Sequence, residues 1–145
     1  MSCYWDTSCL LKLYCREPDS ETYLDLVDQN EEPLVVSSLS VTELFYALLQ
    51  KESRSELGKQ RATGLFAEVE ADIQSGYLRV YPLGDSIYSR AREVAELCYG
   101  STPSIFLRSL DGIHLATALQ SNSDTVVTTD ERMMSASRIL GLKVL

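Results

Sequence analysis

Short apolar runs alternate along this chain with segments of helical periodicity, and the alternation limits the possible folds more than any other feature. The apolar runs are continuous, as expected of strands covered on both faces. The expected strands are residues 3–5, 33–36, 77–81, 125–128 and 142–145, and the expected helical faces are residues 10–14, 23–27, 41–49, 65–73, 87–98, 113–119 and 133–140. This order predicts an α/β fold, a three-layer α/β/α sandwich with a central, mostly parallel sheet.

Length and composition indicate one self-sufficient domain. A chain of 145 residues and 16.2 kDa buries about 68% of its unfolded surface by the usual size scaling, so its core needs no metal or disulfide. The four cysteines form no C-x-x-C pair, and with one histidine a zinc site is not expected, so we interpret them as reduced structural thiols. No basic segment precedes an apolar stretch, and no apolar run reaches the ~18 residues that span a membrane. We therefore expect a cytoplasmic protein without a membrane partner.

Net charge narrows the function classes. The formal charge is −8 and the isoelectric point about 4.6, which argues against a protein that coats nucleic acid. It leaves open an enzyme that grips phosphates through a bound metal. Residues 17–32 hold seven acids and no base, whereas Lys51–Arg61, with four bases and two acids, is the one clearly basic stretch.

Four acids fall where the expected sheet meets its helices. Asp6 follows the first strand, Glu43 lies in the first turn of the helix after the second, Asp111 opens the helix near residue 113, and Asp130 follows the strand at 125–128. In parallel α/β sheets ligands bind outside the carboxyl ends of the strands. We therefore expect these four carboxylates to meet at that edge.

Each acid also has a purely structural interpretation. Asp6 suits an Asx turn, Ser40 and Glu43 have the spacing of a capping box, Asp111 favours the dipole of its helix, and Asp130 suits the N-cap of the last helix. These interpretations account for the residues singly. They do not account for four acids converging on one edge.

Such a cluster is costly without a cation. Two carboxylates 5 Å apart repel by roughly 3 kcal/mol at an effective dielectric of 20, and a helix N-terminus offsets only about 0.3–1 kcal/mol. No Lys or Arg lies in the local motifs of Asp6 or Glu43. The cluster must therefore take up protons or bind a metal, and oxygen-only ligands favour Mg²⁺ or Mn²⁺, which suit phosphodiester hydrolysis. We interpret His114 as a packing or supporting residue rather than a general base.

At these acids the chain resembles the PIN-domain family, most closely the VapC-type toxin ribonucleases of toxin–antitoxin systems. The motifs that carry the resemblance are Trp5-Asp6-Thr7-Ser8-Cys9-Leu10-Leu11-Lys12-Leu13-Tyr14, Ser38-Leu39-Ser40-Val41-Thr42-Glu43-Leu44, Leu107-Arg108-Ser109-Leu110-Asp111-Gly112-Ile113-His114-Leu115-Ala116 and Val127-Thr128-Thr129-Asp130-Glu131-Arg132-Met133. The resemblance implies that residues 1–145 form a single PIN-like nuclease domain. It implies an endoribonuclease dependent on Mg²⁺ or Mn²⁺.

The resemblance also implies the site and the partners. Asp6, Glu43, Asp111 and Asp130 correspond to the catalytic, metal-binding acids, and Ser8 and Thr128 to hydroxyl residues beside them. The implied partners are an RNA substrate, a cognate antitoxin protein and a second copy of the chain. RNA would meet the stretch at residues 51–61 or a groove formed in the dimer.

Two other functions stay open at this point. A non-catalytic PIN-like binding module would be expected to lose the acids, and all four are present. A phosphoryl-transfer enzyme of the haloacid-dehalogenase kind needs a second Asp two residues after Asp6, where Ser8 stands.

Two apolar stripes suggest an interface. They comprise Phe45, Leu48 and Leu49, extended by Tyr46, and Leu65, Phe66 and Val69. We expect these stripes to exceed what one small core buries, and to be covered by a second copy or by an antitoxin.

Overall fold

The computed structural model describes residues 1–59 and 61–145 and confirms the predicted alternation of strands and helices. The strands are β1 (Cys3–Trp5), β2 (Leu34–Ser37), β3 (Leu78–Tyr81), β4 (Thr125–Val127) and β5 (Lys143–Val144). The helices are α1 (Thr7–Tyr14), α2 (Ser20–Asp28), α3 (Ser38–Ser53), α4 (Ala62–Ser75), α5 (Asp85–Gly100), α6 (Ser109–Gln120) and α7 (Glu131–Ile139). All paired strands are parallel, in the order β3-β2-β1-β4-β5.

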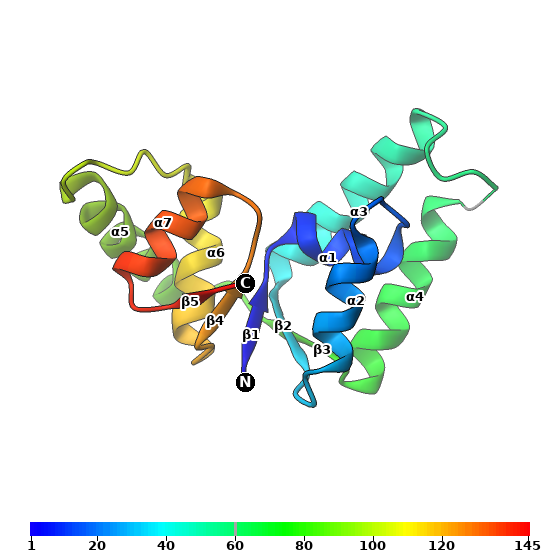
Figure 1. The fold of residues 1–145 in the computed structure, drawn as a ribbon, viewed down its shortest axis with the longest axis horizontal. Helices are drawn as coiled ribbons and strands as arrows, with labels where there is room; N and C mark the ends of the chain where they lie inside the picture. Colours follow the sequence, from blue (N-terminus) through cyan, green and yellow to red (C-terminus); the bar gives the residue numbers. More distant parts are fainter. Residues whose placement is uncertain (60) are drawn as a thin grey trace.

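Helices cover both faces of this sheet, so the predicted three-layer α/β/α fold is confirmed. Helices α1–α4 lie on one side and α5–α7 on the other (Figure 1). Because side chains alternate along a strand, β1 serves both cores: Trp5 packs in the first and Tyr4 in the second, each almost fully buried.

The four cysteines are free and buried, as predicted. None of the described helices is long and apolar enough to cross a membrane.

The strand order brings the acidic segments together. The central strand β1 lies between β2 and β4, and each of these strands leads within a few residues into a helix, α1, α3 or α7. Parallel strands end at the same edge, so the starts of these three helices cluster there. Helix α6 contacts β2, which brings its own N-terminus to the same region.

The N-cap of α3 differs from the prediction. Ser37, not Ser40, is the N-cap: its hydroxyl accepts from the Ser40 N–H at 3.0 Å, and the Ser40 hydroxyl accepts from the Ser37 N–H at 3.2 Å. The proposed capping box of Ser40 with Glu43 is therefore wrong, because the helix begins at Ser38 and Ser40 itself supplies the reciprocal hydroxyl. The Glu43 carboxylate is free of a capping role.

The structural interpretations of Asp130 and Asp6 have different outcomes. Asp130 is the N-cap of α7, with its Oδ1 accepting from the N–H groups of Arg132 (2.9 Å) and Met133 (3.0 Å), as predicted. Asp6 occupies the N-cap position of α1, but its side chain makes no capping hydrogen bond. Helix α4 ends at Ser75, and its C-cap Gly76 has a φ of 82°, the left-handed geometry that glycine adopts freely.

The two apolar stripes are mostly core, contrary to the prediction. Leu48, Leu65 and Val69 are buried because α3 and α4 pack against each other. The rings of Phe45 and Phe66 are in contact, with centroids 4.7 Å apart and planes tilted by 52°. Tyr46 and Leu49 are exposed. Other exposed apolar side chains lie on α5, on the segment that follows it and at the start of α6: Tyr88, Leu97, Tyr99, Phe106 and Leu110. Among them the rings of Tyr99 and Phe106 contact each other, with centroids 5.8 Å apart.

We predict that Ser37→Ala lowers the free energy of unfolding by about 0.5–2 kcal/mol, the usual cost of losing an N-cap side chain. Ser53→Ala is the control, since Ser53 is exposed at the other end of α3 and its hydroxyl only donates to the Gln50 carbonyl. Urea unfolding measures both. Equal stability of the two variants would contradict the assignment of the cap.

Candidate active site

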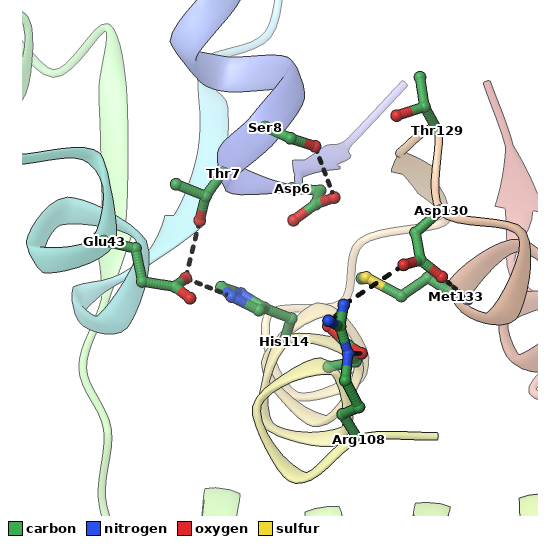
Figure 2. Close-up of a pocket in the computed structure, with 10 residues that line it drawn as sticks. Asp6, Thr7, Ser8, Glu43, Arg108, His114, Thr129, Asp130 and Met133 are labelled. Carbon is green, nitrogen blue, oxygen red and sulfur yellow. Dashed lines mark hydrogen bonds and ion pairs between the residues drawn. The ribbon is translucent and has the colours of Figure 1, made fainter. Parts of the chain in front are cut away.

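One cavity of about 470 Å³ opens at the carboxyl edge of the sheet and receives all four predicted acids. Its lining is drawn from the starts of α1, α3, α6 and α7: Asp6, Thr7, Ser8, Glu43, Arg108, Asp111, His114, Thr129, Asp130 and Met133 (Figure 2). Thr128 lies just behind, buried beside Asp6. The residues predicted from the sequence are thus brought together, and their chemical roles stay predictions.

Asp6 is held by hydroxyl groups. Its Oδ2 accepts from the Ser8 hydroxyl and from the Thr128 hydroxyl, both at 3.0 Å. Thr128 in turn accepts the Asp130 N–H at 3.1 Å, so the two predicted hydroxyl residues connect α1 with the start of α7. The other oxygen of Asp6, Oδ1, has no hydrogen-bond partner in the described part of the chain. It is available to a ligand.

Glu43 is held by a buried polar chain. Its Oε1 lies 2.6 Å from His114 Nε2 and 2.8 Å from the Thr7 hydroxyl (Figure 2). On the other side of the ring, His114 Nδ1 lies 2.6 Å from the Tyr4 hydroxyl. A carboxylate only accepts, so we assign the Nε2 proton to His114 as donor, with the Tyr4 phenol donating to Nδ1. His114 therefore acts as a support, as the sequence suggested, and sequence reasoning missed Thr7.

The pKa of Glu43 reflects this support. Burial alone raises the pKa, but the hydrogen bonds from His114 and Thr7 and the charge of Arg108 outweigh it, so the pKa of Glu43 lies below its ordinary value. Burial strongly raises the pKa of the Tyr4 phenol, which keeps its proton at any physiological pH. Glu43 is therefore a carboxylate at neutral pH, suited to be a cation ligand.

Arg108 supplies a cation that sequence reasoning missed. It immediately precedes α6, and its Nε donates to Asp111 Oδ2 at 2.8 Å, while its Nη2 lies 3.4 Å from Asp130 Oδ2. The hydrogen bond and charge of Asp111, with the charges of Asp130 and Asp6, raise the pKa of Arg108. The available signal was its position three residues before Asp111, a spacing that brings side chains together at a helix start.

The donor set fits a hard cation in its chemistry but not in its present spacing. All four acids offer oxygen, the ligand that Mg²⁺ and Mn²⁺ prefer. Among residues 1–59 and 61–145, however, no three His, Cys, Asp or Glu side chains lie close enough together to hold a metal ion. Arg108 stands between Asp111 and Asp130, and Glu43 is turned towards His114.

The basic stretch at residues 51–61 does not line this cavity. Lys51 is engaged with two acids, Glu17 at 2.9 Å and Glu56 at 3.5 Å. Gln60, within the stretch, lies outside the described residues. A contact between this stretch and RNA stays a prediction.

The chain is similar to known proteins over nearly its whole length. The family model described as PIN domain matches residues 3–139. Ribonuclease VapC46 of Mycobacterium tuberculosis is 31% identical over 144 residues, covering 98% of this chain and 95% of that protein.

Solved structures repeat the fold. VapC20 of M. tuberculosis, titled a sarcin-ricin loop cleaving toxin, aligns with a TM-score of 0.70 at 16% identity, over 93% of this chain and 95% of that one. A toxin–antitoxin complex from Klebsiella pneumoniae aligns with a TM-score of 0.64 at 14% identity, over 99% and 96%. At these identities the two structures establish a shared fold.

We predict that His114→Phe raises the pKa of Glu43 and destabilises the protein. The variant removes a donor to Glu43 and leaves the buried Tyr4 hydroxyl short of a partner, at a cost of about 1–3 kcal/mol. Because folding lowers the pKa of Glu43, its ionisation stabilises the wild type above the ordinary value of 4.5, and this stabilisation is lost as pH falls. That acid-dependent loss should be smaller in the variant.

Carboxyl NMR titration and urea unfolding measure the two effects. Adding Tyr4→Phe should recover part of the lost stability, since it removes the buried Tyr4 hydroxyl, whose remaining partner is the Ser40 hydroxyl at 3.4 Å, without restoring the donor to Glu43. A pKa of Glu43 that does not move in His114→Phe would mean that the imidazole does not hold the carboxylate.

Proposed function

The chain belongs to the PIN-domain family, and we propose that it is a divalent-metal-dependent endoribonuclease that serves as the toxin of a toxin–antitoxin pair. One observation carries the proposal: four carboxylates from the starts of four helices line a single cavity at the carboxyl edge of the sheet. The names of the relatives, a ribonuclease, a loop-cleaving toxin and a toxin–antitoxin complex, support the same class.

Asp6, Glu43, Asp111 and Asp130 would hold Mg²⁺ or Mn²⁺. When bound, such an ion activates a water molecule and offsets the negative charge that develops on a phosphate during hydrolysis. Asp6 offers its free Oδ1, while Ser8 and Thr128 fix its other oxygen. Glu43 offers its Oε2, while His114 and Thr7 fix Oε1. Each carboxylate is thus oriented from behind.

Three side chains of the protein, Glu43, His114 and Arg108, would have separate roles beside the metal. Glu43 has a lowered pKa, which makes it a weak base and a good ligand. Both nitrogens of His114 are engaged, one with Glu43 and one with Tyr4, so neither is free to take a proton from water. Arg108, at the rim, presents a planar guanidinium that matches two oxygens of a phosphate.

Of the two alternative functions, one is excluded and one remains to be tested. Membership of the PIN-domain family removes the haloacid-dehalogenase-like enzyme. A non-catalytic PIN-like module remains the rival for the test below to decide. The presence of all four acids in one cavity favours the enzyme.

For partners we propose single-stranded or loop RNA as substrate, a cognate antitoxin and a homodimer, in the cytoplasm. The contacting rings of Tyr99 and Phe106, both more than half exposed, support a protein interface, because adjoining exposed apolar groups commonly mark one.

We predict that EDTA abolishes RNA cleavage and that Mg²⁺ or Mn²⁺ restores it. Asp6→Asn should lower the cleavage rate by about 100-fold or more, since even the partners of metal ligands cost 10–100-fold when removed. Cleavage of a fluorescently labelled RNA measures both. Full activity in EDTA would exclude the metal mechanism, and inactivity under every metal condition would favour the non-catalytic module.

The control for folding is thermal unfolding in EDTA. Asp6→Asn should be as stable as the wild type or more so, because it removes one of the mutually repelling charges. Asp25→Asn, the same change on the exposed side of α2, should leave both activity and stability unchanged. A large loss of stability in Asp6→Asn would indicate a structural role instead.

We predict a homodimer whose interface includes the exposed apolar group of α5 and α6. Light scattering at tens of micromolar should give twice the 16.2 kDa of one chain. Phe106→Glu should shift the mass towards the monomer, whereas Tyr46→Glu, on the exposed side of α3, should not. A monomeric wild type at this concentration would contradict the prediction.

A further inference from the structure

Arg108 occupies the place in the cavity where a bound cation is needed. Its guanidinium bridges α6 and α7, with ion pairs to Asp111 at 2.8 Å and Asp130 at 3.4 Å. The Asp111 side chain is only 11% exposed and the Asp130 side chain 30%, whereas that of Arg108 is 64% exposed. Two fixed carboxylates therefore hold one movable cation.

The acids of the cavity are compensated in different ways. Hydroxyl groups donate hydrogen bonds to Asp6, and the imidazole of His114 donates one to Glu43. For Asp111 and Asp130, Arg108 is the only ion-pair partner within residues 1–59 and 61–145. Without it, two carboxylates would face each other across a wet cavity without a positive charge between them.

A metal ion would need the same oxygens. Mg²⁺ binds carboxylate oxygens at 2.0–2.1 Å in a near-octahedral shell. Arg108 donates to both oxygens of Asp111, at 2.8 and 3.5 Å, and approaches Oδ2 of Asp130, whose Oδ1 is taken by two backbone N–H groups. The oxygens that face the cavity from α6 and α7 are therefore those that the guanidinium occupies.

We propose that Arg108 is a built-in counter-ion which competes with the divalent cation for Asp111 and Asp130 and must swing aside when the metal binds. This inference rests on the proposed function for the identity of the cation. It adds that the protein's own side chain sets the metal affinity, holding the site closed to metal until the concentration is high enough to displace it.

The surroundings allow the movement. The Arg108 side chain makes no hydrogen bond in the described part of the chain other than those to Asp111 and Asp130. Three further hollows also have Arg108 in their walls. Two of them, of about 400 and 340 Å³, are lined in part by Asp130 or Asp111, whereas the third, of about 270 Å³ between α5 and α6, has no carboxylate in its lining. The hollow between α5 and α6 therefore offers the side chain a position away from the carboxylates.

A fixed brace is the competing interpretation. If Arg108 holds Asp111 and Asp130 in the right positions for the metal, removing it should weaken metal binding. If Arg108 competes with the metal, removing it should tighten metal binding. The two roles predict opposite signs.

The experiment is a calorimetric titration of the metal-free full chain with MnCl₂, without RNA. We expect Arg108→Gln to bind Mn²⁺ about 10-fold more tightly than the wild type. The matched control is Arg132→Gln, which removes the same charge from an exposed side chain that flanks Asp130 without an ion pair to it among the described residues. The control should change the affinity by less than about 3-fold. Weaker binding by Arg108→Gln, or equal tightening by both variants, would overturn the proposal.

A second readout protects against a variant that folds poorly. In EDTA, Arg108→Gln should unfold at a lower temperature than the wild type, and saturating Mn²⁺ should raise that temperature by more than it does in the wild type. Arg108→Lys keeps the charge beside the carboxylates and should bind Mn²⁺ within about 3-fold of the wild type. A tenfold gain in Arg108→Lys would overturn the proposal. Neither readout involves RNA, so both hold or fail independently of the nuclease activity.

Discussion

The mutual repulsion of four carboxylates at one edge of a parallel sheet is the constraint around which this site is built. The strand order β3-β2-β1-β4-β5 makes the convergence unavoidable, since β1, β2 and β4 all end there. Each acid has its own stabilising donors: two hydroxyls for Asp6, an imidazole and a hydroxyl for Glu43, two backbone N–H groups for Asp130, and the guanidinium of Arg108 for Asp111. These donors reduce the repulsion without cancelling the charge, which leaves a site still suited to a cation.

The support of the site is part of the core. Three consecutive residues at the start of the chain serve three regions: Tyr4 enters the core under α5–α7, Trp5 enters the core under α1–α4, and Asp6 enters the cavity. A phenol buried among apolar side chains needs a partner, and Tyr4 finds His114, which in turn holds Glu43. The position of Glu43 thus depends on the packing of β1 against α6, and a change in that core is transmitted to the site.

The sequence predicted the elements and the four acids because both are local signals. Periodicity identifies strands and helices, and the edge rule for parallel sheets gathers whatever follows the strands. The prediction for the N-cap of α3 was wrong because Ser37, Ser38 and Ser40 can all cap a helix. The spacing of Ser40 and Glu43 matches the usual Ser–Glu capping box more closely than the Ser37–Ser40 pair that forms. Sequence reasoning also missed contacts across long sequence separations, such as Thr7 with Glu43 and Arg108 with Asp130. Those depend on side-chain rotamers that no periodicity records.

The geometry of the cavity explains how the negative charge of this protein affects the binding of RNA. A cavity lined by four carboxylates and one guanidinium is negative, so it repels the phosphates of RNA unless further positive charge enters it. On the proposed function, a divalent ion held by these acids would add two positive charges to the cavity, and an arginine released from the carboxylates would add a planar group that fits phosphate oxygens. Metal binding would then have to come before productive RNA binding. A site that repels phosphate until it holds a metal ion would make RNA binding depend on the concentration of the cation, through the charge of one small cavity.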